Sequence, residues 1–196
     1  NSVTEPAIAR MCHRAGVLRI SKSVYAEMRL RLQDSLEMIL QKSILLMDAD
    51  NRKTLLERDA RKAFELCGID LAVGVNNDIK RAHEHKSAPK KEGTTHKFKA
   101  GTVALRDIRY QQKNSDTYVI PKAVFDRLLH EFSQEYKDEI RIADDAKMII
   151  QVGIEHNLVV LLEAAYKIVV GKGQNTLKVD EITLARSILE TKYLQR

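Results

Sequence analysis

The sequence predicts an all-α protein built from two successive blocks, each with a short, a long and a short helix. Aromatic residues make up 5% of the 196 residues, Trp is absent, and there are 3 Pro and 8 Gly. Sandwiches and barrels need many Gly- and Pro-rich turns, so this profile disfavours them. Two stretches of about 28 residues carry apolar side chains at helical spacing, and such stretches form long amphipathic helices.

A polar and basic segment, residues 75–100, divides the chain. It holds seven Lys and Arg against three Asp and Glu, and so contributes most of the net charge of +6. With almost no aliphatic side chains, it buries too little surface to fold alone. We therefore expect one domain over residues 1–74, a linker and entry segment over 75–100, and a second domain over 101–196.

Start and stop signals place the helices of each block. Thr4 suits the N-cap of the first helix, and Gly68 the end of the third. Asp144 and Asp145 suit the start of the second long helix, because acidic side chains favour the positive helix end. The predicted helices of the first block cover residues 5–15, 23–50 and 56–67. Those of the second block cover 119–136, 144–171 and 179–189, preceded by an extra helix over 102–112.

The long helices predict how the two blocks pair. Each spans about 42 Å and is apolar around much of its circumference, so two short neighbours cannot shield it. The simplest partner of equal length is the other long helix. A repeated spacing supports a duplicated layout, because Arg19 precedes Thr54 by 35 residues and Arg141 precedes Thr176 by 35 residues.

Several motifs carry a specific family resemblance. The first block resembles the histone H-four fold in EPAIARMCHRAGVLRISKSVYAEMR (5–29) and NRKTLLERDARKAF (51–64). The second resembles histone H-three in HKFKAGTVALRDIRYQQK (96–113), FDRLLHEFSQEYKDEIRI (125–142) and VDEITLARSI (179–188). The order of fusion is similar to that of the histone doublets of giant DNA viruses (Marseillevirus-like).

The resemblance implies two histone folds paired in an intramolecular handshake. It implies a core histone doublet that wraps double-stranded DNA largely without sequence specificity, in a nucleosome-like particle with an H-two-A/H-two-B-like partner. A second copy would associate through the H-three-like half. The expected location is the virion and the host nucleus or viral factory, or nuclear chromatin for a cellular protein.

In this handshake each first loop lies beside the other half's second loop, so we expect Arg19 beside Thr176 and Arg141 beside Thr54. Arg side chains that enter the minor groove are typical of histone–DNA contact. Arg52 is also expected to pair with Asp59. The DNA-binding residues that the resemblance implies are Arg19, Arg141, Thr54, Thr176, Arg52, Lys53, Lys22, Arg10, Arg14, Arg106, Arg109, Lys97, Lys99, Lys113, Lys122 and Arg127.

The resemblance also implies a self-association surface, formed by Ile168, Gly171, Glu181, Leu184 and Ile188. Two departures from the family pattern weaken it. Gln174 stands where the family has Arg, so the ion pair with Glu181 is not expected. Gly171 replaces a family His.

Other functional classes find less support. His83, Glu84 and His85 lack the helical spacing of a zinc protease, and Cys12 and Cys67 are typical of small core residues. We therefore expect no catalytic residues, no metal and no cofactor. The longest apolar run, residues 158–162, is too short to predict a membrane partner. The remaining alternative is a histone-fold protein–protein interaction module of a transcription or assembly factor.

Overall fold

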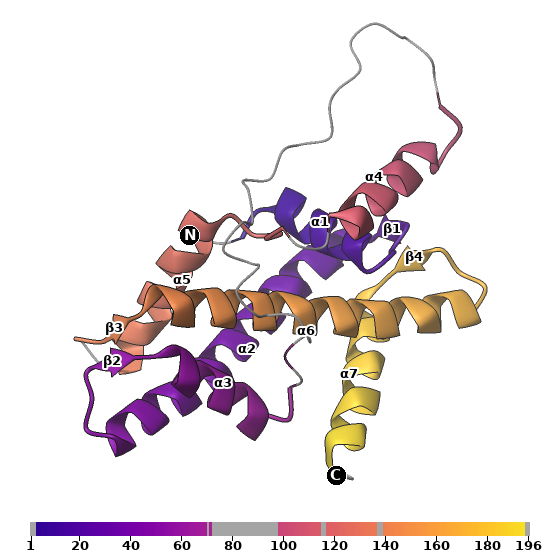
Figure 1. Cartoon of the computed structure of the whole chain (residues 1–196). Helices are drawn as coiled ribbons and strands as arrows, with labels where there is room; N and C mark the ends of the chain where they lie inside the picture. Colours follow the sequence, from indigo (N-terminus) through magenta and orange to yellow (C-terminus); the bar gives the residue numbers. More distant parts are fainter. Residues whose placement is uncertain (1–2, 70, 72–97, 115–116, 137–138, 195–196) are drawn as a thin grey trace, which may run out of the picture. The chain divides into compact units, whose positions relative to one another are not determined.

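The fold is described from a computed structural model of the chain. The description covers residues 3–69, 71, 98–114, 117–136 and 139–194, with side chains to residue 190. The elements in chain order (Figure 1) are α1 (Glu5–Arg14), β1 (Arg19–Ile20), α2 (Lys22–Ala49), β2 (Thr54–Leu55), α3 (Glu57–Leu66), α4 (Thr102–Lys113), α5 (Lys122–Tyr136), β3 (Arg141–Ile142), α6 (Asp144–Gly171), β4 (Thr176–Leu177) and α7 (Val179–Leu194). Most of the expected linker lies outside the described residues.

The predicted order of helices is confirmed, and α2 and α6 both contain 28 residues. The boundaries of α1 to α4 differ from the prediction by at most one residue, and two later boundaries differ by more. Helix α5 begins at Lys122, three residues later than expected. Pro121 explains the shift, because proline disfavours a helical conformation at the residue before it, and its carbonyl accepts hydrogen bonds from Val124 N and Phe125 N. Helix α7 continues five residues further than predicted, to Leu194.

The residues form two compact units, and each unit draws on both halves of the sequence. Unit 1 contains α2 from Met28, β2, α3, α5, β3 and α6 up to Leu158. Unit 2 contains α1, β1, the start of α2, α4, α6 from Val159, β4 and α7. Each half therefore supplies part of both cores.

Both units have a fully buried apolar core. In unit 1, Phe64 of α3 and Gly153 of α6 lie so close that a Cβ at Gly153 would clash with the ring. The small residue therefore lets the two helices approach. Other buried side chains of unit 1 are Leu36, Ile39, Leu40, Phe125, Leu129 and Ile149. Those of unit 2 include Ile8, Met11, Cys12, Val17, Leu162, Ala165, Val169 and Ile182.

In unit 1, two buried polar side chains of α6 fix the chain just before α5. Gln151 Nε2 donates to Ile120 O at 2.8 Å, and Ile120 N donates to Glu155 Oε1 at 3.0 Å. Gln151 Nε2 also donates to the same carboxylate oxygen at 3.0 Å. Buried polar groups are tolerated when they are paired in this way, so this cluster sets the start of α5.

Helix α6 is long and apolar enough, by length and composition alone, to cross a membrane. Its most apolar 18-residue window has a mean hydropathy of 1.4, and 61% of that window is buried inside the protein. The core helix of a folded domain meets the same criterion, so this finding is weak evidence for a membrane span.

Candidate nucleic-acid interface

Unit 2 brings the first loop of the first half beside the second loop of the second half. Strands β1 and β4 pair in parallel, with Arg19 opposite Thr176 and Ile20 opposite Leu177 (Figure 1). Ser21 N extends the pairing by donating to Leu177 O at 3.0 Å. Leu177 is fully buried while Arg19 is exposed. We call residues 19–23 and 172–178 the β1–β4 site.

Unit 1 repeats this arrangement with the loops of the opposite halves. Strands β2 and β3 pair in parallel, with Thr54 opposite Arg141 and Leu55 opposite Ile142. Arg141 N donates to Lys53 O at 3.1 Å, and Ala143 N donates to Leu55 O at 3.0 Å. We call residues 50–56 and 139–145 the β2–β3 site. Both expected Arg–Thr pairings are therefore confirmed as neighbours in register.

An Arg–Asp pair holds the loop of the β2–β3 site, as expected. Arg52 Nη2 donates to Asp59 Oδ1 at 2.7 Å, and Arg52 Nη1 donates to Asp59 Oδ2 at 2.9 Å and to Thr54 O at 3.0 Å. Asp59 Oδ2 also accepts a hydrogen bond from Leu56 N at 2.9 Å. Such two-point contacts fix geometry as well as adding energy. Arg52 therefore shapes the backbone that carries Thr54.

The same pair shifts two titrations. Burial by itself raises the pKa of Asp59, but the hydrogen bonds from Arg52 and Leu56 N, with the charges of Arg52 and Arg58, lower it overall. The hydrogen bond to Asp59 raises the pKa of Arg52. The carboxylate is buried, with 4% of Asp59 exposed. A buried charge is stable only when paired, so Asp59 and Arg52 depend on each other.

The β1–β4 site has an ion pair that the sequence did not predict. Gln174 does not supply the cation, but Lys172 Nζ lies 3.0 Å from Glu181 Oε1. Glu181 Oε2 accepts from Lys178 N at 3.1 Å. The hydrogen bond from Lys172 is the main cause that lowers the pKa of Glu181. Gln174 cannot form this ion pair, as expected, and Lys172, which was not predicted for this role, supplies the cation instead.

The two sites differ in the charges around their arginines. Near Arg141, the first turn of α6 carries Asp144 and Asp145, which are exposed, and Glu139 lies 3.9 Å from Lys53. Near Arg19, α2 begins with Lys22 and has no acidic residue in its first turn. The Ser21 and Ser23 hydroxyls there lie 2.9 Å apart.

Two of the expected DNA-binding arginines contact backbone instead of pointing freely outward. Arg10 Nη2 donates to Val119 O at 2.9 Å. Arg14 Nη2 donates to Asn114 O at 3.1 Å and to Thr117 O at 2.8 Å. These bonds join α1 to the segment that follows α4. Helix α1 also packs beside α4 itself (Figure 1). The structure thus gives Arg10 and Arg14 a place in holding unit 2 together.

The remaining expected basic residues lie on or next to α4 and α5. Arg106 stacks over the ring of Phe98, with its Cζ 4.2 Å from the ring centroid. Arg127 Nε donates to Ala123 O at 3.1 Å, within α5. The other exposed members, with Lys53 of the β2–β3 site, are Lys99, Arg109, Lys113 and Lys122. Lys97 lies outside the described residues.

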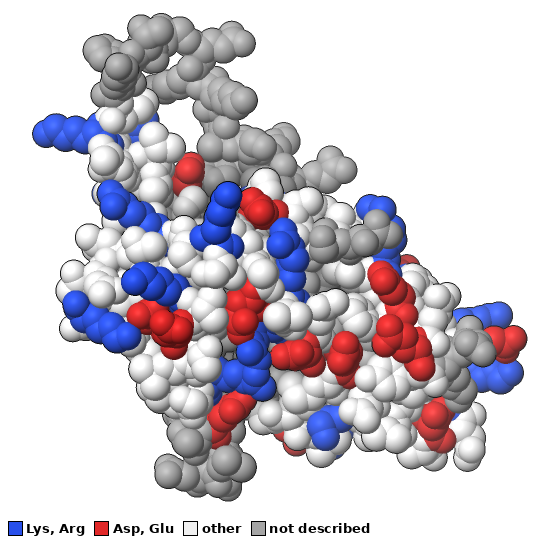
Figure 2. All heavy atoms as spheres, turned by 180° about the vertical axis from the view of Figure 1, so that it is seen from behind, with Lys and Arg blue, Asp and Glu red and all other residues white. Residues whose placement is uncertain are grey.

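On the face that Figure 2 shows, charge alone does not mark an interface. Figure 2 shows a face on which Lys and Arg side chains alternate with Asp and Glu side chains, without one dominant basic patch. Some exposed acidic side chains of the described residues are paired locally, such as Asp34 with Arg31 and Glu190 with Arg186. The paired loops, and not the net charge, therefore define the candidate interface.

The expected self-association residues of unit 2 are only partly exposed. Leu184 is 45% exposed, Ile188 is 54% exposed, and nearby in sequence Val170 is 57% exposed. Gly171 is exposed with open space around it, and Ile168 is half-buried. Glu181 is buried and its carboxylate pairs with Lys172 of the same chain. Its side chain therefore holds the loop between α6 and α7 and is not exposed for contact with a second copy.

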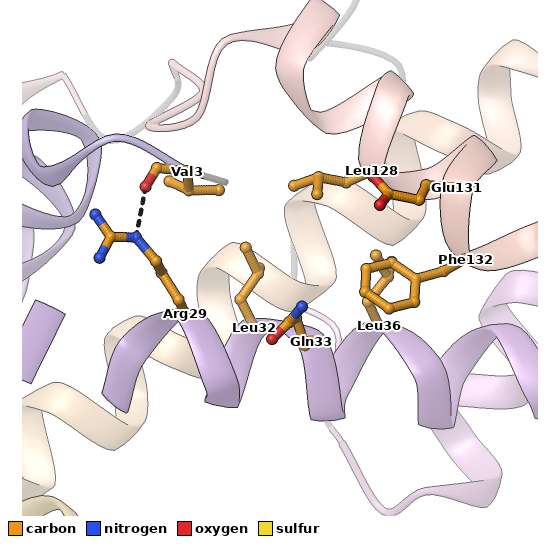
Figure 3. A pocket seen from close by; sticks show the side chains of 8 residues that line it. All are labelled: Val3, Arg29, Leu32, Gln33, Leu36, Leu128, Glu131 and Phe132. Carbon is orange, nitrogen blue, oxygen red and sulfur yellow. Dashed lines mark hydrogen bonds between the residues drawn. The ribbon is translucent and has the colours of Figure 1, made fainter. Parts of the chain in front are cut away.

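Unit 1 also contains a small pocket of about 170 Å³ (Figure 3). Arg29 Nε donates to Val3 O at 2.9 Å at its edge. The other lining residues are Leu32, Gln33, Leu36, Leu128, Glu131 and Phe132. Figure 3 shows the side chains of α2 facing those of α5 across it. The lining is mainly apolar core, with few of the convergent polar groups typical of a ligand site.

Other reactive groups are mostly buried. Burial raises the pKa of the Cys12 thiol to about 12 and also raises that of Cys67. Among the described residues, no group of three or more His, Cys, Asp or Glu side chains could hold a metal ion. His83, Glu84 and His85 lie outside the described residues.

Comparisons with known proteins agree with this geometry. The structure is similar to the crystal structure of the histone from Methanopyrus kandleri, with a TM-score of 0.58 over 93% of this chain and 92% of that chain, at 14% sequence identity. The fold is the histone fold. Residues 100–188 also match the family model of the core histone domain, which covers histones H-two-A, H-two-B, H-three and H-four.

With the histone fold established, the two strand pairings have a clear place in it. Each joins the first loop of one half to the second loop of the other, as in a histone handshake within one polypeptide. The extra helix predicted before the second half is α4. The matched range, residues 100–188, begins just before α4 and ends within α7.

Proposed function

We propose that this chain is a core histone doublet that binds and wraps double-stranded DNA. The observation that carries the proposal is the duplicated pairing of an exposed arginine with a threonine, Arg19 with Thr176 and Arg141 with Thr54. The proposed halves are an H-four-like fold over residues 1–74 and an H-three-like fold over 101–196, joined by the segment 75–100.

Each site offers the same kind of contact. The guanidinium of Arg19 or Arg141 enters the minor groove where it narrows, and the neighbouring backbone N–H groups and cations hold the adjacent phosphates. Arg52 in one site and Lys172 in the other keep the loops in shape. Because these contacts read backbone and groove shape, the specificity follows DNA deformability rather than base sequence.

The exposed apolar side chains support a larger assembly. In unit 2, Val170, Leu184 and Ile188 fit association with a second copy. In unit 1, Leu45 is 63% exposed and Leu66 is 56% exposed, which fits docking of an H-two-A/H-two-B-like partner. Exposed apolar patches often mark protein interfaces. The proposed particle is nucleosome-like, and nuclease digestion of a reconstituted particle tests it by the length of DNA protected.

The proposed setting is a viral genome, packaged in the virion and used in the host nucleus or viral factory. The support is the fusion of an H-four-like and an H-three-like half in one polypeptide. For a cellular protein, the corresponding location is nuclear chromatin. Detection of the chain in purified virions by mass spectrometry, against its absence from uninfected cells, tests this setting.

Removal of both exposed arginines tests DNA binding directly. Arg19→Ala combined with Arg141→Ala should weaken binding to double-stranded DNA about tenfold or more and reduce the slope of log affinity against log salt by about two, one for each lost phosphate-region contact. Titration of a fluorescent duplex at several salt concentrations measures both quantities. A circular dichroism melt should be unchanged, since both side chains are exposed.

A charge-matched control separates the effect of losing the two sites from the effect of lowering the net charge. Arg31→Ala combined with Arg186→Ala also removes two cations, but both of these residues lie outside the two sites and pair with acidic neighbours. This control should bind DNA almost as the parent does. Parent affinity that barely responds to salt would contradict DNA packaging and favour the protein–protein interaction module instead.

A further inference from the structure

The two long helices end in the same way, which aligns their following loops residue by residue. After α2, Asn51 has a positive φ of 53°, and Arg52 N donates to Met47 O at 3.1 Å. After α6, Gly173 has a positive φ of 68°, and Gln174 N donates to Val169 O at 3.0 Å. This is the usual left-handed helix stop. Arg52 and Gln174 are therefore structural equivalents.

The cation that holds each loop comes from a different position. In the β2–β3 site it is Arg52, two residues before Thr54. In the β1–β4 site it is Lys172, four residues before Thr176, at the position equivalent to Asp50. Lys172 reaches forward to Glu181 in the first turn of α7, so its ion pair encloses β4.

We propose that Lys172 is a positioning residue that holds β4 beside β1 through Glu181 and so presents Arg19 and Thr176 together to DNA. The inference rests on the proposed DNA-binding function. The Glu181 carboxylate, itself buried, accepts hydrogen bonds from Lys172 Nζ and Lys178 N, on either side of β4. Loss of the cation leaves a buried charge without its ion-pair partner, which favours a rearranged loop.

The competing explanation is that Lys172 binds a phosphate directly, because its side chain is 46% exposed. The two explanations predict opposite signs for a change at Glu181. Glu181→Met raises the net charge by one, so simple electrostatics predicts tighter DNA binding. If the ion pair positions β4, the same change weakens binding, because the loop that carries Thr176 loses its anchor.

The experiment measures duplex-DNA affinity for the full chain and for Lys172→Met, Glu181→Met and Lys172→Arg. We expect Lys172→Met and Glu181→Met each to weaken binding on the order of three- to tenfold, as loss of a charge-assisted hydrogen bond allows. Lys172→Arg should bind within about twofold of the parent, since it keeps a cation that reaches the carboxylate. Tighter binding by Glu181→Met would overturn the proposal.

Variants of the two exposed arginines show through which site Lys172 acts. Lys172→Met should add little to Arg19→Ala, because both changes disable the β1–β4 site. It should add its full effect to Arg141→Ala, because distant independent changes are additive. Equal effects in both backgrounds would contradict a role through the β1–β4 site. If Arg19→Ala itself leaves DNA binding unchanged, the proposed function fails, and not only the role of Lys172.

A relocated cation controls for loss of fold. Gln174→Arg in the Lys172→Met chain puts a guanidinium at the position equivalent to Arg52, two residues before Thr176. We expect it to restore DNA affinity to within about threefold of the parent, as a bidentate Arg–carboxylate pair provides. Suppose that Lys172→Met lowers the midpoint of thermal unfolding, and that adding Gln174→Arg to this chain restores the midpoint but not the DNA affinity. That result would refute the positioning role.

Discussion

The β1–β4 and β2–β3 sites share one backbone plan but differ in how each is anchored and charged. In both, an exposed arginine faces a threonine across a parallel two-residue pairing. The β2–β3 site is anchored by a guanidinium with two bonds to Asp59 and one to a carbonyl. The β1–β4 site is anchored by an amine with one bond to Glu181.

The charged residues next to each site differ in the opposite direction, because the more strongly anchored site has the more acidic neighbours. The strongly anchored β2–β3 site has Glu139, Asp144 and Asp145 close to its arginine in sequence, whereas α2 at the β1–β4 site begins with Lys22. Carboxylates near a phosphate contact oppose it, while a cation favours it. The duplicated plan thus preserves geometry and lets local charge vary. We expect the β1–β4 site to contribute more to DNA affinity.

The largest effects should come from charges placed in the two cores. Leu36→Asp in unit 1 and Leu162→Asp in unit 2 each bury an unpaired carboxylate where the parent side chain is fully buried. Each should cost more than about 4 kcal/mol and remove the cooperative thermal transition. Leu30→Asp, at a 54% exposed position of α2, is the control and should melt nearly as the parent. A parent-like melt of Leu36→Asp would break the packing on which the comparison depends.

Intermediate effects should come from the two anchoring carboxylates. The pKa values of Asp59 and Glu181 are below their ordinary values in the native state. Each therefore stabilises the fold above the ordinary carboxyl pKa of about 4, and this contribution is lost as the pH falls through the lowered pKa. Asp59→Asn and Glu181→Gln should each lower the free energy of unfolding by about 1–3 kcal/mol at neutral pH.

Urea denaturation at two pH values checks this and ranks the anchors. The larger loss is expected for Asp59→Asn, because its partner makes more bonds. As the pH falls through the lowered native pKa values, the parent carboxyls become protonated, so the differences between variants and parent should shrink. A difference that stays constant with pH would show that the stabilisation does not come from the ionised carboxylates.

The smallest effect should come from the acidic start of α6. Asp144→Asn with Asp145→Asn should tighten DNA binding about two- to threefold at low salt, with the gain fading at high salt. Exposed Asp34→Asn with Glu163→Gln removes the same charge away from both sites and is the control. Equal gains in the two variants would mean that net charge alone sets the DNA affinity. The acidic start of α6 would then not distinguish the β2–β3 site from the β1–β4 site.

The arrangement of the fold followed from the sequence to a large extent. Apolar spacing predicted the lengths of α2 and α6, and the equal offsets of Arg19 from Thr54 and Arg141 from Thr176 indicated a duplicated layout. The family resemblance then implied which loops pair. These features are local or repeated, so one sequence displays them. The start of α5 was missed by three residues, although Pro121 was a signal for it.

The electrostatic details of the site were harder to predict. The Lys172–Glu181 pair joins residues nine positions apart across β4. The position two residues before Thr176 holds Gln174, and the cation that pairs with Glu181 lies two residues further upstream, at Lys172. The backbone bonds of Arg10 and Arg14 join residues 100 or more positions apart. No local pattern reveals such distant carbonyls, so both arginines resemble free cations in the sequence.

The division of each compact unit between both sequence halves has a consequence for synthesis. Neither core is complete until the second half has left the ribosome, so the first half cannot complete its folding before then. Covalent linkage then supplies that partner at a high effective concentration. Pairing of the two halves is therefore insensitive to dilution. Because one polypeptide contains both halves, they are always made in a one-to-one ratio.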